Sequence, residues 1–309
     1  MTRDELTMLQ ALPLEIKIEK TKARLKEYIE YFGLNHVYIS YSGGKDSEVL
    51  LDIARQLYPN IKAVFINTGQ EFPETIKQVL LRKKQGYNID IITPKMRYKD
   101  VIEKYGYPVI SKEQAQYLEE AKNTKSERLR NVRLNGKNGS YKISNKWKYL
   151  LDEDIKISAK CCNILKKAPV KKYEKETNRH PIVATMAEES QLRLNSYIKN
   201  GCNSFSEKRS ISRPLGFWKE EDIWNYIKTN NLKISEMYTV HGSERTGCYG
   251  CLFGCHLEER ETGTNRITKL KKTHPALYCY LMEKLNYKKI MEVLSLMTYE
   301  IVQEKLFDI

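Results

Sequence analysis

The sequence has no run of about 18 apolar residues, which is the length that a membrane-spanning helix needs. It begins with MTRDELTMLQALPLEI, a stretch that carries acidic residues and lacks the basic-then-apolar order of a secretory signal. We therefore expect a cytoplasmic protein with no membrane segment. A disordered chain is excluded as well, because 41% of the 309 residues are hydrophobic. At about 150 residues per domain, the length predicts one large domain or two modest ones.

Cysteine is scarce and odd in number. The chain has seven cysteines spread along its length, which disfavours a disulfide framework and leaves metal binding or redox chemistry open. Cys202 and Cys279 stand alone, and isolated cysteines are usually small buried apolar side chains. No cysteine follows Cys279 in the sequence.

Positive charge is in excess, since 53 Lys and Arg against 39 Asp and Glu give a formal net charge of +14. Between residues 122 and 179, 17 basic residues stand against six acidic ones, so this segment alone carries +11. Basic residues interleaved with aromatic ones suit phosphate contacts combined with base stacking, so DNA or tRNA is an expected partner; a solvated Lys-rich loop is the alternative. The interleaved residues are Tyr141, Lys142, Lys146, Trp147, Lys148 and Tyr149.

Short β-branched or aromatic runs alternate with amphipathic stretches in the first part of the chain. The runs at 36–40, 62–68 and 88–93 predict strands, and 46–57 and 73–85 predict helices between them. Strands separated by helices of this length form βαβ units. The fold class that we predict is therefore α/β, with a doubly wound parallel sheet covered by helices on both faces.

The alternation returns later in the chain, with strands predicted at 181–186 and 209–215 and helices at 188–198 and 219–230. Between the two stretches, the polar residues 123–148 predict an inserted loop or hairpin. We expect three segments, which are an N-terminal helical segment at 1–35, a nucleotide-binding domain at 36–234 with a basic insertion at about 111–156, and a Cys-rich loop with a helical tail at 235–309.

The strongest local pattern is YSGGKDS at 41–47, directly after a predicted strand and at the start of a predicted helix. Backbone amides of Gly43 and Gly44 and the N-terminus of the helix point at one spot, which suits a pyrophosphate, and Lys45 adds a positive charge. The loop is not a Walker A motif, because that motif needs a glycine where this chain has Ile39. A plain Gly-Gly turn with Asp46 capping the helix is the alternative.

SGGKDS in this position resembles the PP-loop ATP pyrophosphatases, whose members cleave ATP between the α and β phosphates to adenylate a substrate, or bind an adenylated one. NTGQEFPET at 67–75 is similar to the DTG-x-x-FPET element of the phosphoadenylylsulfate (PAPS) reductase branch, with Asn67 in place of the usual Asp. The resemblance covers roughly residues 36 to 256 and implies an adenine nucleotide α-hydrolase-like fold. Further motifs follow in family order, namely KCCNILKKAPV at 160–170, ATMAEESQLR at 184–193 and ISRPLGFWKEEDIWNYI at 211–227.

The resemblance implies a role for each matching residue, with ATP or an adenylated nucleotide as the ligand and Mg²⁺ as a cofactor. Lys45 and Asp46 are the implied catalytic residues. Lys166, Lys167 and Arg193 would face an anionic substrate, with surface charge as the alternative. Residues implied to bind the nucleotide are Ser42, Gly43, Gly44, Lys45, Asp46, Ser47, Asn67, Thr68 and Gly69, the last three at the carboxyl end of a strand, where ligands of α/β folds gather.

The cysteines form a second strong pattern. Cys161 and Cys162 are adjacent, and Cys248, Cys251 and Cys255 form C-x-x-C-x-x-x-C among glycines, so their thiolates can reach one metal centre. The CC and C-x-x-C pairs resemble those of assimilatory adenylylsulfate reductases, which carry a 4Fe-4S cluster, whereas the third downstream cysteine is more similar to the DNA phosphorothioation branch. That resemblance favours Cys161, Cys248, Cys251 and Cys255 as ligands, with Cys162 as the alternate. Structural zinc is the competing assignment, and His256 is able to substitute for a thiolate.

Three functions follow from these patterns. The first is an adenylating enzyme that prepares DNA or tRNA for iron-sulfur-dependent sulfur transfer, of the DNA phosphorothioation or tRNA thiolation type, with a donor protein supplying the sulfur. The second is a PAPS or adenylylsulfate reductase; such enzymes act through a thiol near the C-terminus, which MTYEIVQEKLFDI at 297–309 does not contain. The third is a non-enzymatic, metal-containing nucleic-acid-binding module, against which the intact SGGKDS argues.

Overall fold

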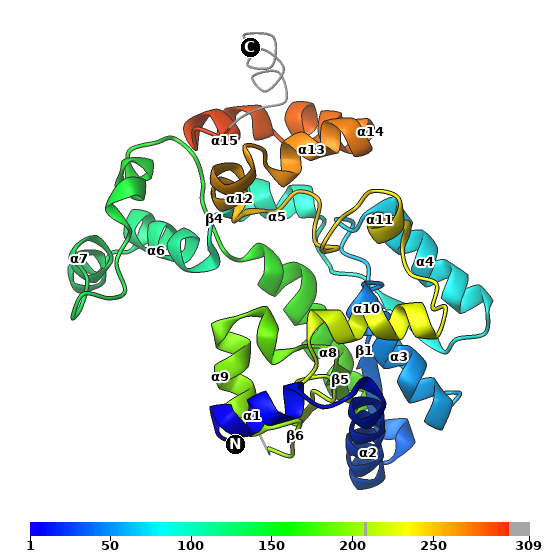
Figure 1. Cartoon of the computed structure of the whole chain (residues 1–309). Coiled ribbons are helices and arrows are strands. Elements are labelled where there is room, and N and C mark those ends of the chain that lie inside the picture. The colour runs from blue at the N-terminus through cyan, green and yellow to red at the C-terminus, as the bar shows by residue number, and fades with distance from the viewer. Residues whose placement is uncertain (207–208, 297–309) are drawn as a thin grey trace. The chain divides into compact units, whose positions relative to one another are not determined.

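The computed structural model describes residues 1–206 and 209–296, and its chain divides into two compact units (Figure 1). The sheet unit comprises 1–67, 72–93 and 169–246. The cysteine unit comprises 68–71, 94–168 and the chain from 247 onward. Of the helices in the part of the chain that the structure describes, none is long and apolar enough to cross a bilayer.

The sheet unit is built around a sheet in the order β3-β2-β1-β5-β7-β6, parallel throughout its described strands except for β6, which runs antiparallel to β7. The strands are β1 (Val37–Ser40), β2 (Ala63–Ile66), β3 (Ile89–Ile92), β5 (His180–Val183), β6 (Asn203–Ser204) and β7 (Ile211–Ser212). The helices are α1 (Arg3–Gln10), α2 (Leu14–Phe32), α3 (Lys45–Leu57), α4 (Pro73–Lys84), α8 (Ala168–Thr177), α9 (Gln191–Asn200), α10 (Glu220–Thr229) and α11 (Glu236–Thr239). The predicted strands and helices of the α/β pattern are thus confirmed.

Both faces of the sheet are covered, because successive side chains of a strand point to opposite faces. Ile39 of β1 is buried in the large core that includes Leu25 of α2 and Leu50 of α3. Tyr38, the residue before it, packs instead against Val64 of β2 and Tyr173 of α8. A sheet with helices on both faces is the doubly wound arrangement that the sequence predicted.

Strand order places the SGGKDS loop at a ligand-binding position. β1 pairs with β2 on one side and β5 on the other, so the connections leaving β1 and β5 diverge. In open α/β sheets, ligands bind outside the carboxyl ends of the strands at such a switch point. The loop at 41–44 leaves the carboxyl end of β1 and leads directly into α3.

The cysteine unit is mainly helical, with a short parallel pair of strands in which Val109 lies opposite Leu252. Its elements are α5 (Tyr98–Tyr105), β4 (Val109–Ile110), α6 (Lys112–Asn123), α7 (Glu127–Asn135), the 3₁₀ helix η2 (Asn145–Leu151), the π-helix η3 (Asn163–Lys167), β8 (Leu252–Phe253), α12 (Cys255–Thr262), α13 (Arg266–Thr273), α14 (Pro275–Cys279), the π-helix η5 (Tyr280–Lys284) and α15 (Tyr287–Val293).

The prediction of a loop or hairpin at 123–148 is wrong, because the segment holds α7 and the start of η2. Ser126 caps α7 by accepting a hydrogen bond from the Leu129 amide, and most residues of ERLRNVRL favour a helix. The Asn and Gly residues that suggested a hairpin form only an isolated bridge between Lys137 and Ser140. The C-terminal stretch 297–309, where we looked for a catalytic thiol, lies outside the described residues.

Candidate functional site

The SGGKDS loop has the geometry of an anion-binding turn. Gly43 has φ +72°, and a Cβ there would lie 2.8 Å from Thr75 Cγ2, so both backbone conformation and space require glycine. Gly44 is the N-cap of α3 and gives no side-chain cap to the helix. The first turn of α3 therefore presents backbone amides and the positive end of the helix dipole.

Hydroxyl groups surround this turn. Ser47 donates to the Gly44 carbonyl at 2.8 Å, while the Ser42 amide donates to Ser47 Oγ at 3.2 Å. The Lys45 amide donates to the Tyr238 hydroxyl at 3.2 Å, and this hydroxyl lies 3.1 Å from Thr246 Oγ1. Sequence reasoning missed Tyr238 and Thr246, because they come from a distant segment that carries no motif.

Lys45 is the most buried charge of the loop, with 3% of its surface exposed. Its Nζ lies 3.2 Å from Asp46 Oδ1 and 3.0 Å from Glu220 Oε1, and it faces the rings of Trp224 and Tyr238. Burial by itself would lower the pKa of Lys45, but the charge of Asp46 and the contacts with Glu220 outweigh it and raise the pKa. Lys45 is therefore a positively charged ammonium group whose position is fixed by Asp46 and Glu220.

Asp46 is a carboxylate whose surroundings oppose its charge. Burial raises its pKa, Lys45 acts in the opposite direction, and Glu189 and Glu220 raise it further. Its Oδ1 has no hydrogen bond within the described residues, although Lys45 Nζ is an ion-pair partner. A buried carboxylate near other carboxylates calls for a cation, and Lys45 supplies only part of that charge.

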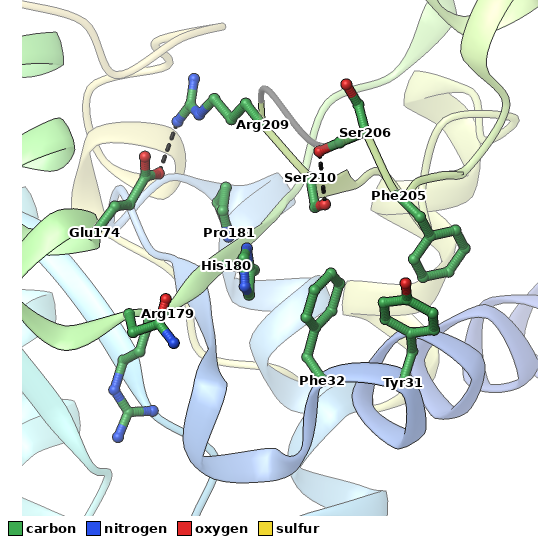
Figure 2. A pocket seen from close by; sticks show the side chains of 11 residues that line it. Tyr31, Phe32, Glu174, Arg179, His180, Pro181, Phe205, Ser206, Arg209 and Ser210 are labelled. Carbon is green, nitrogen blue, oxygen red and sulfur yellow. Dashed lines mark hydrogen bonds and ion pairs between the residues drawn. The ribbon is translucent and has the colours of Figure 1, made fainter.

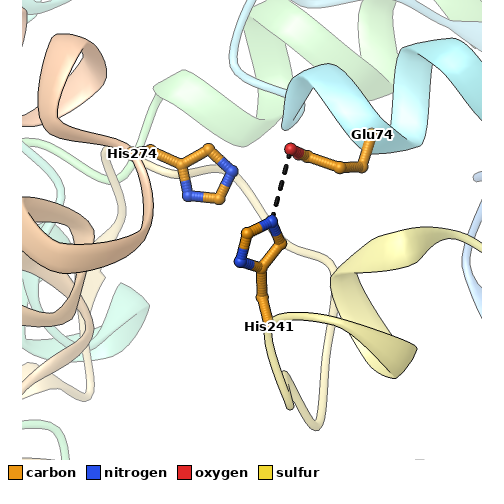
Figure 3. A group of neighbouring side chains, drawn as sticks. All are labelled: Glu74, His241 and His274. Atoms are coloured by element: carbon orange, nitrogen blue, oxygen red, sulfur yellow. Dashed lines mark ion pairs between the residues drawn. The ribbon is translucent and has the colours of Figure 1, made fainter.

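The segment that carries Tyr238 is fixed to α4 by ion pairs. Lys77 contacts both carboxylate oxygens of Glu236, at 2.9 and 3.0 Å. His241 Nε2 lies 3.4 Å from Glu74 Oε1, in the first turn of α4 (Figure 3). These contacts explain how a short helix, α11, holds Tyr238 against the loop.

The remaining residues predicted in the sheet unit lie at strand ends and helix starts. Asn67 directly follows β2, and its amide donates to the Ile92 carbonyl at 2.9 Å. Arg193 lies in the first turn of α9, where its guanidinium forms an ion pair with Glu189. Glu189 also raises the pKa of Asp46, so Arg193 is linked to the loop through the carboxylate of Glu189.

Residues 68–71 belong to the cysteine unit. The Thr68 amide and hydroxyl both donate to Glu71 at 2.8 Å, and Gly69 has φ +74°, which glycine adopts readily. The Lys166 amine lies 3.7 Å from Glu71 Oε1, and although burial lowers the pKa of Lys166, Cys248 and Glu71 outweigh it and raise that pKa. Lys166, predicted to face an anionic substrate, therefore contacts the cysteine loop, while Lys167 is exposed.

The five predicted ligand cysteines lie in one unit. Cys161 and Cys162 precede η3, Cys248 and Cys251 lie in a loop, and Cys255 begins α12. The side chains of Cys161, Cys162, Cys248 and Cys251 are close enough for their charges to interact, and Cys255 interacts with Cys251.

The pKa values of the adjacent cysteines, Cys161 and Cys162, shift in opposite directions. The hydrogen bond with Cys161 lowers the pKa of Cys162 to about 6, burial opposes this, and Lys112, Lys166 and Lys167 lower it further. The same hydrogen bond, followed by burial, raises the pKa of Cys161. The neighbouring lysines Lys112, Lys166 and Lys167 thus favour a thiolate at this pair.

The loop between Cys248 and Cys251 is clamped by side chains that no sequence motif marks. The Gly250 carbonyl accepts hydrogen bonds from the hydroxyls of Tyr98, at 3.0 Å, and Tyr287. A Cβ on Gly250 would lie 2.7 Å from Gln70 Oε1, so a larger residue would be displaced from the clamp. Gln70 Nε2 in turn donates to the Tyr249 hydroxyl at 3.0 Å.

The basic segment is only partly available to a nucleic acid. Trp147 is 6% exposed and packs in the cysteine unit, so it is removed from the predicted stacking surface, whereas Tyr141 is exposed. The Lys122 amine donates to three backbone carbonyls, those of Leu150, Glu153 and Ile155, and is structural. Lys142 and Lys146 are exposed, and no residue of α7 is buried.

Known proteins similar in sequence or structure to this chain include the following three. It is 26% identical over 272 residues to an uncharacterised protein of Methanocaldococcus jannaschii, which covers 84% of this chain and 50% of that protein, so the chain spans about half the length of that relative. It is 24% identical to an adenosine 5′-phosphosulfate reductase of Lysinibacillus sphaericus, over 70% of this chain and 73% of that protein. A PAPS reductase structure from Candida auris aligns with a TM-score of 0.44 and 16% identity, covering 81% of this chain and 96% of that one.

A match to a protein family identifies the family. The description "Phosphoadenosine phosphosulfate reductase domain" fits residues 36–135 and 113–252, which together cover more than half of the chain and include the loop and the cysteine pairs Cys161–Cys162 and Cys248–Cys251. With its parallel sheet and its SGGKDS turn at the switch point, this chain belongs to the phosphoadenosine phosphosulfate reductase domain family.

Proposed function

We propose that the chain is an ATP pyrophosphatase that adenylates a nucleic acid for sulfur transfer. The observation that supports this most strongly is the buried, charged Lys45 at the N-terminus of α3, beside backbone amides at the switch point of the sheet. This arrangement would stabilise pyrophosphate as negative charge develops on it.

In the proposed reaction, a substrate oxygen attacks the α-phosphorus of ATP. The bond from this phosphorus to the oxygen that bridges to the β-phosphate breaks, and pyrophosphate leaves with the electron pair. Hydrosulfide supplied by a donor protein then attacks the atom that bears the adenylated oxygen; the sulfur loses its proton to water, and AMP leaves with the electron pair of the broken bond. Lys45 and the amides of α3 hold the pyrophosphate group in line with the attack.

The loop also fits Mg²⁺, which binds through one or two carboxylates together with substrate phosphates. Asp46 is buried, and Glu189 and Glu220 are near enough to raise its pKa. Asp46 would hold the ion, which would neutralise charge on the phosphates. The exposed position of Glu220 allows it to turn toward either Lys45 or a cation.

Five cysteines gather in the cysteine unit, and their thiols are close enough to influence one another's charge, which suits a metal centre with thiolate ligands. We propose that Cys161, Cys248, Cys251 and Cys255 hold a 4Fe-4S cluster, with Cys162 as the alternate ligand, and that a bound cluster supplies redox or sulfur-carrying chemistry.

The adenylation proposal is tested by ATP–pyrophosphate exchange in the presence of candidate DNA or tRNA. Lys45→Ala should lower the exchange rate by about 10²-fold or more, as the loss of a transition-state contact does elsewhere. Lys84→Ala, which removes an exposed lysine of α4, is the matched control and should leave the rate unchanged. Release of ADP and orthophosphate as the main products would contradict the proposal.

The cluster assignment is tested by anaerobic purification and absorption spectroscopy. We expect a brown protein with a broad band at roughly 400 nm, because iron-sulfur centres absorb there and zinc does not. Cys248→Ser should remove the band, whereas Cys279→Ser should retain it. A colourless protein with stoichiometric zinc would show that the site holds a structural ion.

A sulfonucleotide reductase is the second candidate, favoured by the reductase name of the Lysinibacillus sphaericus relative. The purified protein, given adenylylsulfate or PAPS together with thioredoxin, would then produce sulfite. Sulfite formation without pyrophosphate exchange would replace the first proposal by the second.

A further inference from the structure

A cavity lies in the sheet unit at the amino ends of the strands, opposite to the end that carries the SGGKDS loop. Its volume is about 380 Å³, and it is lined by His180 and Pro181 at the start of β5 and by Ser210 just before β7. Because β1 and β5 are parallel, the amino end of β5 lies away from the loop that follows the carboxyl end of β1. Small-molecule sites commonly enclose about 300–1,000 Å³. We call this cavity the amino-edge pocket.

One side of the amino-edge pocket is aromatic. Tyr31 and Phe32 end α2, Phe205 directly follows β6, and His180 lies between them and the charged side (Figure 2). The ring centroids of Phe32 and His180 are 3.9 Å apart, and those of Tyr31 and Phe205 are 4.6 Å apart. Phe205 is 38% exposed, so its ring offers a surface on which a planar group can stack.

The other side of the pocket is charged and positive on balance. Arg209 Nη2 lies 2.7 Å from Glu174 Oε1, and the Tyr38 hydroxyl donates to the same oxygen at 2.8 Å. Arg179 Nη1 donates to the Val37 carbonyl at 2.9 Å. Each guanidinium carries five N–H donors, so these contacts leave donors of both arginines for a ligand.

Two buried donors of the sheet unit have no acceptor within the described residues. Tyr28 is fully buried, and its hydroxyl makes no hydrogen bond there. Arg213 Nη1 is likewise buried and unpaired among those residues. Neither residue lines the pocket, but the ring of Tyr28 packs against Phe32 and Phe205, which do. Buried donors are rarely left without an acceptor in a folded protein.

We propose that the amino-edge pocket binds a nucleotide, with its base on the ring of Phe205 and its phosphate on the arginine side. An uncharged aromatic ligand would leave the N–H donors of Arg179 and Arg209 without an anion, and an aliphatic anion would leave the rings uncovered. A planar base joined to a phosphate satisfies both sides. The same chemistry is supplied by a free mononucleotide or by one unit of a single-stranded nucleic acid. The proposal does not depend on adenylation at the SGGKDS loop.

The test is calorimetric binding of uridine 5′-monophosphate and of hexauridylate to the full chain at fixed salt. Arg209→Gln removes a charge-assisted contact and Phe205→Leu removes the ring while keeping apolar bulk, and each should weaken binding by about tenfold. Arg97→Gln makes the same change of charge at an exposed position of the cysteine unit and should leave the affinity unchanged. Binding of the mononucleotide indicates a free nucleotide as ligand, and binding of hexauridylate alone indicates a strand.

Photo-crosslinking of 5-bromouridine 5′-monophosphate to the wild-type protein needs no variant. It therefore tests nucleotide binding in the pocket even if a substitution prevents folding. Peptide mapping should place the adduct on Tyr31, Phe32, His180 or Phe205. Absence of binding by both probes, equal affinity of Arg209→Gln, Phe205→Leu and wild type, or an adduct confined to other segments would overturn the proposal.

Discussion

Glu220 contacts the amine of Lys45, the group that would bind a phosphate. Its carboxylate lies 3.0 Å from Lys45 Nζ and also accepts a hydrogen bond from Trp224 Nε1 at 3.1 Å. With half of its side chain exposed, Glu220 can move away when an anion arrives. Glu220 thus keeps the buried ammonium paired, and it would compete with a phosphate bound at Lys45.

Replacing Glu220 by Gln should therefore strengthen nucleotide binding. Gln keeps an acceptor for Trp224 but removes the negative charge, and an exposed ion pair contributes at most about 1 kcal/mol, so the Kd for ATP should fall by about two- to fivefold. Glu221→Gln is the matched control, because the Glu221 side chain is exposed and pairs with Lys219. Weaker ATP binding by Glu220→Gln, measured calorimetrically with Mg²⁺, would instead identify Glu220 as a metal ligand.

At this scale the sequence predicted residues that belong to recognisable motifs. Ser42, Gly43, Lys45 and Asp46 lie together because four or five consecutive residues cannot be far apart. Tyr238 and Glu220 reach Lys45 only through the fold. Nothing in the sequence pairs either residue with Lys45, because neither position carries a ligand pattern such as the one that joined the distant cysteines.

Among the elements, α10 is held to α2 by a buried ion pair. Lys17 Nζ lies 2.6 Å from Asp222 Oδ2, and both side chains are almost completely buried. The Lys219 amide donates to the same oxygen at 2.7 Å, so Asp222 also caps the start of α10. Because α10 carries Glu220 and Trp224, this pair fixes the helix that faces Lys45.

Lys17→Met should lower the free energy of unfolding by about 3–5 kcal/mol, since it leaves Asp222 as an uncompensated buried charge. Chemical denaturation followed by circular dichroism measures the change. Lys20→Met, on the exposed side of the same helix, should change stability by less than about 0.5 kcal/mol. Equal stability of the two variants would mean that water reaches Asp222.

Helices and strands whose apolar residues recur with a clear period were predictable from the sequence. Features that depend on tertiary packing were not. An apolar run such as 62–68 predicts a strand, because both faces of a strand in a parallel sheet are buried. The helix α7 was missed because it buries no residue, so its sequence has no apolar stripe. The clamp formed by Tyr98 and Tyr287 on Gly250 joins residues separated by up to 189 positions, which no local pattern encodes.

For the molecule as a whole, the excess charge of +14 predicts salt-dependent binding to nucleic acid. Log K for duplex DNA should fall linearly with log salt, by about 0.9 for each phosphate neutralised. Replacing Lys142, Lys146 and Lys148 by Gln together should reduce that slope by up to about 2–3. The matched control replaces three exposed lysines of the sheet unit, Lys20, Lys26 and Lys84. An unchanged slope, or no binding at low salt, would identify the segment as solubilising.

Because the two units alternate along the chain, strands that pair in one sheet are synthesised at different times. The chain passes between the units after residues 67, 71, 93, 168 and 246, so neither unit is formed by one continuous segment of the chain. β1, β2 and β3 leave the ribosome early, but β5, the other neighbour of β1, comes only after residue 179. At about 5–20 residues per second, the central strand waits several seconds with one edge unpaired. Nascent chains stalled near residue 170 should therefore need a chaperone to cover that edge, and chains released past residue 215 should not.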